Sequence, residues 1–232
     1  MNALVFELVG PAGVGKTAVL QAIAHATPAL CTGIRIDRLR QLPGMLWSLV
    51  VLSPALIDMT FTDAREAWPG LRHLGRLRTL PTEVIAAQAS GHQAILLDEG
   101  PVFSLGRLRA FHGADGNRGP VARRWQSEMT RWSSLLNGII FLDAPNTILA
   151  ERIRQRSKAH QIKSGSTREM FAFLDRYRAA YRDIVQRMNA DSHIPIMELD
   201  TSTASVEQIT AHTVTALESW GVRLGDAARR GA

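Results

Sequence analysis

The sequence of 232 residues contains a single cysteine, Cys31, few aromatic residues (6%) and no long uninterrupted apolar run. One cysteine can form neither an internal disulfide nor a cysteine-based metal site, which is typical of a reducing compartment. The longest apolar stretch, 45–59, is interrupted by polar residues and proline, and it is shorter than the roughly 18–20 residues that cross a bilayer. The N-terminus has no basic segment ahead of an apolar one, so it does not resemble a secretory signal. We therefore expect a soluble, cytoplasmic protein without a membrane partner.

Lysine is also scarce. There are three lysines, so the other 24 of the 27 cationic residues are arginines, and the formal net charge is +6. Such an excess suits nucleic acid, phosphorylated small molecules or an arginine-rich genome, and composition does not choose among them. The chain lacks the lysine runs and interleaved aromatic residues of a strand-binding channel, which disfavours a nucleic-acid partner.

Short β-rich runs alternate with longer helical patterns, which is typical of a parallel sheet covered by helices on both faces. We expect strands at 3–9, 33–37, 94–97, 139–142 and 194–199. We expect helices at 15–27, 45–59, 71–90 with a break at Pro81, 101–137 with an interruption at 113–120, 146–156, 168–189 and 205–220. The predicted fold is an α/β, three-layer αβα domain over 1–220 with a five-stranded parallel sheet, followed by a flexible tail at 221–232.

A phosphate-binding motif lies between the first predicted strand and the first predicted helix. It reads Gly10-Pro11-Ala12-Gly13-Val14-Gly15-Lys16-Thr17 and matches G-x-x-x-x-G-K-[ST]. Its glycines allow the tight turn that aims backbone N–H groups at phosphate oxygens, and the following helix adds the positive end of its dipole. The motif predicts nucleotide binding, with Lys16 on the β- and γ-phosphates and the Thr17 hydroxyl on Mg²⁺.

Two carboxylates follow the third predicted strand, where a group close to the magnesium ion is expected. Asp98 is the candidate metal residue, and Glu99 stands beside it. One of them would hold Mg²⁺ through water while the other accepts a proton from the acceptor. The sequence does not decide which takes which role. Asp143 also ends a strand, but Pro145 follows closely, which favours a helix cap for that residue.

The second half of the chain carries a family resemblance. The segment Phe141-Leu142-Asp143-Ala144-Pro145 and the following R-x-x-x-R pair, Arg152 and Arg156, resemble the fourth strand and lid entrance of thymidylate kinases and related nucleoside and nucleotide kinases. Asp200-Thr201-Ser202 occupies the place of that family's loop near the adenine. The resemblance implies a P-loop kinase core with an arginine-bearing lid at about 156–167, with Arg152, Asp200 and Thr201 near ATP and with Arg152 and Arg156 catalytic.

The acceptor half departs from this family. Thymidylate kinases carry Asp-Arg after the third strand, where this chain has Asp98-Glu99-Gly100-Pro101. After the second strand the family commonly has Arg-Glu-Pro, whereas this chain has Asp37-Arg38. The regions 40–92 and 101–137 are expected to bind the acceptor, although they match no known pattern.

Arginines cluster at the expected lid and in the acceptor half. Arg152 and Arg156 share a helix face, whereas Arg154 points away from it. His160 matches no ligand spacing and is expected at the surface. The group Arg123, Arg124 and Arg131 has no assigned role.

The sequence therefore predicts an ATP- and Mg²⁺-dependent kinase of a small-molecule acceptor, with nucleosides and nucleotides first. A kinase of a sugar, antibiotic or other metabolite is the alternative. Two hypotheses come from other functional classes: a nucleotide-dependent ATPase or switch, and a nucleic-acid-end kinase. The absence of an N-K-x-D motif disfavours a GTPase. The oligomeric state is left open, a homodimer included.

Overall fold

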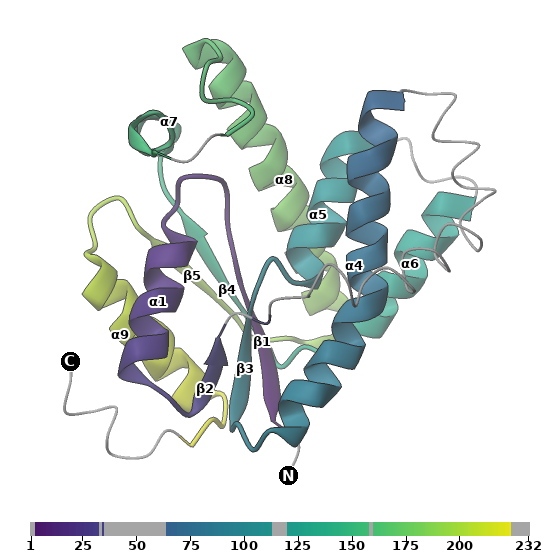
Figure 1. The fold of residues 1–232 in the computed structure, drawn as a ribbon, viewed down its shortest axis with the longest axis vertical. Coiled ribbons are helices and arrows are strands. Elements are labelled where there is room, and N and C mark those ends of the chain that lie inside the picture. Colours follow the sequence, from purple (N-terminus) through teal and green to yellow (C-terminus); the bar gives the residue numbers. More distant parts are fainter. Residues whose placement is uncertain (1–2, 33, 35–63, 113–119, 158–159, 224–232) are drawn as a thin grey trace.

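A computed structural model describes residues 3–32, 34, 64–112, 120–157 and 160–223 (Figure 1). The predicted helix at 45–59 and Asp37-Arg38 lie outside these residues. The predicted acceptor region and lid are described only in part, so their boundaries stay predictions.

The centre of the structure is a five-stranded, all-parallel sheet in the order β2-β3-β1-β4-β5. Its strands are β1 (Leu4–Val9), β2 (Leu30–Thr32), β3 (Ala94–Asp98), β4 (Gly138–Asp143) and β5 (Ile196–Asp200). The central strand β1 pairs with β3 through Phe6 and Leu96 and with β4 through Leu8 and Ile140. This architecture confirms the predicted α/β fold class.

Helices cover both faces of the sheet (Figure 1). On one side, α1 (Lys16–Ala26) packs against α9 (Val206–Ser219). On the other side, α5 packs between α4 and α8, and α6 and α7 also contact α8. The bounds of these helices are α4 (Ala64–Ala89), α5 (Pro101–His112), α6 (Pro120–Ser133), α7 (Asn146–Gln155) and α8 (Thr167–Ser192). No helix in the described part of the chain is long and apolar enough to cross a membrane.

The second strand of the structure is Leu30–Thr32, where the buried Leu30 pairs with Ala94 of β3 as soon as the chain leaves α1. The strand predicted at 33–37 lies outside the described residues except for residue 34. One local prediction is wrong. The predicted break at Pro81 is absent, and α4 continues through it. Leu77, Leu80 and Val84 are all buried along this helix. Their packing offsets the hydrogen bond that proline removes.

Candidate functional site

The phosphate-binding motif forms the turn between β1 and α1. A Cβ on Gly10 would lie 2.2 Å from the carbonyl oxygen of Leu142, so only glycine lets the chain leave β1 so close to β4. Gly13 and Gly15 have φ values of +85° and +96°, in the left-handed region that favours glycine. Gly15 caps α1 without a side-chain hydrogen bond. The sequence thus shapes a glycine-lined cradle at the positive end of a helix.

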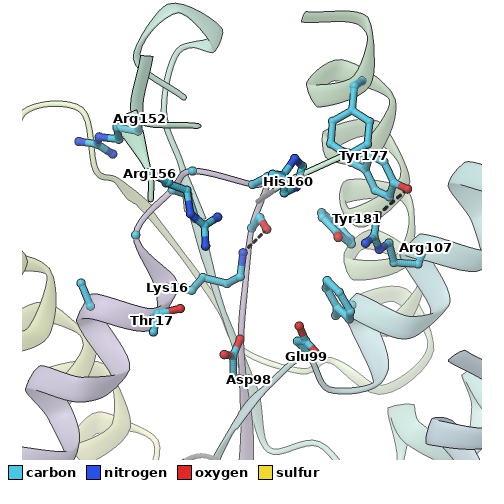
Figure 2. Close-up of a pocket in the computed structure, with 18 residues that line it drawn as sticks. Lys16, Thr17, Asp98, Glu99, Arg107, Arg152, Arg156, His160, Tyr177 and Tyr181 are labelled. Atoms are coloured by element: carbon cyan, nitrogen blue, oxygen red, sulfur yellow. Dashed lines mark hydrogen bonds between the residues drawn. The ribbon is translucent and has the colours of Figure 1, made fainter. Parts of the chain in front are cut away.

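Lys16 bends back over this cradle. Its Nζ donates to the carbonyl oxygens of Gly10 at 2.7 Å and Pro11 at 3.2 Å. Burial lowers the pKa of Lys16 to about 8, although the carboxylates of Asp98 and Glu99 act in the opposite direction. Both carboxylates and Lys16 line one cavity of about 580 Å³, together with Thr17 (Figure 2). The structure therefore brings together the carboxylates and the cradle that the sequence singled out.

Arg76 of α4 fixes the turn that carries the two carboxylates. Its guanidinium donates to the carbonyl oxygens of Glu99 at 2.6 Å and Asp98 at 3.1 Å, and it lies 3.5 Å from the Glu99 carboxylate. Glu99 has φ +57°, which is uncommon for a residue other than glycine. Burial raises the pKa of Asp98, and Lys16 opposes that rise. Arg76 thus stabilises a strained turn; no sequence motif marks it.

Arg152 and Arg154 lie in α7, and Arg156 caps its C-terminus. Arg152 and Arg156 both line the cavity, whereas Arg154 is exposed and donates to Thr167. Arg152 also donates to the Thr201 hydroxyl at 3.0 Å and its carbonyl oxygen at 2.7 Å. It therefore connects α7 to the loop after β5.

The loop after β5 itself does not reach this cavity. Thr201 is buried, and the carboxylate of Asp200 accepts a hydrogen bond from the Ser202 amide at 2.7 Å. Neither residue lines the cavity around Lys16. Arg152 links that cavity to Thr201.

The opposite wall of the cavity is aromatic. Five rings form it: Phe103 from α5, His160 from the segment before α8, and Phe173, Tyr177 and Tyr181 from α8. His160 packs edge-on against Phe173, with centroids 5.7 Å apart. His160 is half-buried and lies in the segment before α8, so it belongs to the cavity wall.

Arg107 of α5 joins this wall. Its guanidinium carbon lies 5.4 Å from the Phe103 ring centroid and 4.8 Å from that of Tyr177. Its Nη1 donates to the Tyr177 hydroxyl at 2.7 Å. Figure 2 shows Arg107 across the cavity from Lys16 and Arg156. Sequence reasoning missed Arg107 because no spacing relates it to the cradle.

Asp143 serves a different purpose from the predicted cap. Both of its carboxylate oxygens accept from Arg178 of α8 at 2.9 Å, and α7 has no side-chain cap. Because the pair is largely shielded from water, the charge-assisted hydrogen bonds between Arg178 and Asp143 are strengthened. The helix-cap prediction for Asp143 is therefore wrong.

The residues of the cavity fit a magnesium nucleotide. Within the described residues, no three His, Cys, Asp or Glu side chains gather into a metal site of their own. The Thr17 hydroxyl and the Asp98 carboxylate supply oxygen donors on one cavity, and Mg²⁺ in such sites takes its other ligands from phosphates and water. The cradle offers glycine-lined backbone, a helix N-terminus and Lys16 to the phosphates.

Comparisons with known proteins support the fold. No protein-family model matches the chain, and no curated protein matches it. Solved structures do match it. One is the thymidylate kinase of Candida albicans, with a TM-score of 0.56 and 12% sequence identity, over 94% of this chain and 92% of the other. At that identity the likeness shows a shared fold, an α/β fold with a parallel sheet and a P-loop, and not a shared activity.

The lowered pKa of Lys16 predicts proton uptake when ATP binds. Polyphosphate charge raises the pKa of a neighbouring amine, so a lysine with a pKa of about 8 in the free protein becomes fully protonated in the complex. Calorimetry at pH 8 in buffers of different ionisation enthalpy should show uptake of about 0.5 proton per ATP, falling towards zero at pH 6. Lys16→Met should abolish the uptake. Equal uptake at both pH values would contradict the assignment.

Proposed function

We propose that this chain is a kinase that transfers the γ-phosphoryl group of ATP, with Mg²⁺, to a small-molecule acceptor. The observation that carries this proposal is that one cavity joins a phosphate cradle to an aromatic wall bearing an arginine. A nucleotide switch needs the cradle alone, whereas phosphoryl transfer needs room for a second molecule beside it. Nucleosides and nucleotides are the first acceptors to test, and sugars, antibiotics and other metabolites follow.

On the ATP side, each residue has a role that its position supports. The cradle 10–17 binds the phosphates, Lys16 neutralises the β- and γ-oxygens, and Thr17 and Asp98 hold the magnesium ion. Bound magnesium supplies charge neutralisation between the phosphates. Arg156 lies beside Lys16 (Figure 2) and stabilises charge on the transferred group, while Arg152 ties α7 to Thr201. Positioning and electrostatic stabilisation of this kind carry most of the catalysis of phosphoryl transfer.

On the acceptor side, Glu99 is the proposed general base for a hydroxyl acceptor, because Arg76 holds its backbone and carboxylate in one place. Arg107 is the proposed partner of an anionic group on the acceptor. It lies on the aromatic wall, so an acceptor with a planar ring and an acidic group would meet both. The resembling family carries an arginine directly after its third strand, a position that Glu99 occupies in this chain.

Lys16→Ala is expected to abolish phosphoryl transfer while the far-ultraviolet circular dichroism spectrum stays that of the wild type. An ATP-consumption screen over nucleosides, nucleoside monophosphates, sugars, aminoglycosides and nucleic-acid ends measures this. A variant with wild-type turnover would overturn the role of the cradle. Acceptor-independent ATP consumption would point instead to an ATPase or switch.

Arg156→Ala is expected to lower kcat by about a hundred- to a thousand-fold and to weaken ATP binding much less, because its contact strengthens in the transition state. Arg154→Ala is the matched control, since Arg154 lies two residues earlier in the chain and is exposed. Steady-state kinetics and equilibrium ATP binding separate the two effects. Equal losses in both measurements would argue against a transition-state contact.

Arg107→Gln is expected to raise the KM for an anionic acceptor by about 10- to 100-fold, because a hydrogen bond to a charged group is worth about 1.5–3 kcal/mol. The KM for ATP should stay close to that of the wild type. Arg109→Gln, which removes an arginine of α5 paired with Asp183, is the control. An unchanged acceptor KM would remove Arg107 from the binding site.

A further inference from the structure

A carboxylate lies in the middle of the central strand. Glu7 is fully buried, and its neighbours along β1, Phe6 and Leu8, are fully buried apolar residues. It pairs in register with Leu97 of β3 and Ile139 of β4. A buried carboxylate is costly unless its oxygens are hydrogen-bonded. Glu7 has no part in the proposed transfer, so its place in the core calls for another explanation.

Both carboxylate oxygens of Glu7 accept hydrogen bonds from the start of α5. Oε2 accepts from the Val102 amide at 2.7 Å and Oε1 from the Phe103 amide at 2.8 Å. First-turn amides have no partner within their own helix, and here a side chain from the central strand supplies one. A Cβ on Gly100 would lie 2.8 Å from Oε2, so a glycine at that position permits the approach.

Phe103 connects these two hydrogen bonds, which we call the Glu7 cap, to the cavity. Its amide donates to Glu7, while its ring lines the cavity wall. The same ring lies under the Arg107 guanidinium and stacks on Tyr181 with centroids 6.3 Å apart. One residue therefore links the Glu7 carboxylate with the arginine proposed to meet the acceptor.

We propose that Glu7 is a positioning residue that fixes the first turn of α5, and with it Phe103 and Arg107, relative to the phosphate cradle. Glu7 and the cradle belong to one continuous segment, since Gly10 follows β1 directly. The cap therefore ties the acceptor wall to the strand that carries the cradle. Its consequence for catalysis rests on the proposed function, whereas the hydrogen bonds and their dependence on ionisation do not.

Ionisation of Glu7 controls the cap, because only the carboxylate offers two accepting oxygens without a competing proton. Burial raises the pKa of Glu7 to about 8 from its ordinary value near 4.5. The amides of Phe103 and Val102 and the charge of Arg76 oppose that rise, and Asp98 adds to it. The Tyr181 hydroxyl also lies within electrostatic reach.

The raised pKa of Glu7 determines how the stability of the fold changes with pH. Between about pH 4.5 and 8 the folded protein holds a proton on Glu7 that the unfolded chain has released. The contribution of Glu7 to stability is therefore greatest below this window and decreases as the pH rises through it. The second amide hydrogen bond forms fully only above a pH of about 8.

Nuclear magnetic resonance of the full chain tests the proposal without an acceptor. The amide shifts of Val102 and Phe103 should titrate together with a midpoint near 8, and the Arg107 Nε signal should follow the same curve. Glu7→Gln should remove this step, and Glu198→Gln, an exposed substitution in β5, should leave it intact. Flat amide shifts in the wild type, or a step that persists in Glu7→Gln, would overturn the proposal. The wild-type curve alone decides if the variant fails to fold.

Kinetics supply the second readout. Above a pH of about 8, where Glu7 is ionised, Glu7→Gln should raise the KM for the acceptor found by the screen at least threefold more than the KM for ATP, and Glu198→Gln should change neither. An unchanged acceptor KM beside a lost titration would overturn the positioning role. If the screen finds no acceptor, the proposed function fails, whereas the magnetic resonance titration still decides the Glu7 cap.

Discussion

The parallel pairing of β1 with β3 on one side and β4 on the other is the constraint on which the site depends. Parallel strands bring their carboxyl ends to one edge of the sheet. The cradle follows β1, the pair Asp98-Glu99 follows β3, and α7 follows β4. The carbonyl oxygen of Leu142 then stands so close to Gly10 that no side chain fits there. The backbone geometry of the sheet thus brings together the N–H groups of the cradle, the two carboxylates and the arginines at the end of α7.

Charge is the second organising feature of the cavity. Lys16, Arg107 and Arg156 face Asp98 and Glu99 from different elements. Burial lowers the pKa of Lys16, and the charges of Arg156 and Arg107 lower it further. A polyphosphate would relieve both effects, because its negative charge favours the protonated amine. The grouping of these cations in one cavity therefore favours an anionic ligand.

Local patterns predicted most of this architecture, and packing over long sequence distances explains what they missed. The cradle and Asp98 are recognisable because a strand end and glycine spacing place them without help from the rest of the chain. Arg107 and Tyr177 lie seventy residues apart and meet only because α5 packs on α8. The short strand β2 was not predicted, because three residues carry too little periodicity. Glu7 did leave a signal, as a charged residue within an otherwise apolar strand.

The central claim is that the γ-phosphoryl group of ATP reaches an acceptor held against the aromatic wall. Phosphorus magnetic resonance of the protein with Mg²⁺, ATP and pooled acceptors observes the fate of that group directly. The account predicts that the γ-phosphorus signal is replaced by the signal of a new phosphoester or phosphoanhydride, in proportion to the ADP formed. Conversion of ATP to ADP and inorganic phosphate alone, whichever acceptors are present, would contradict it.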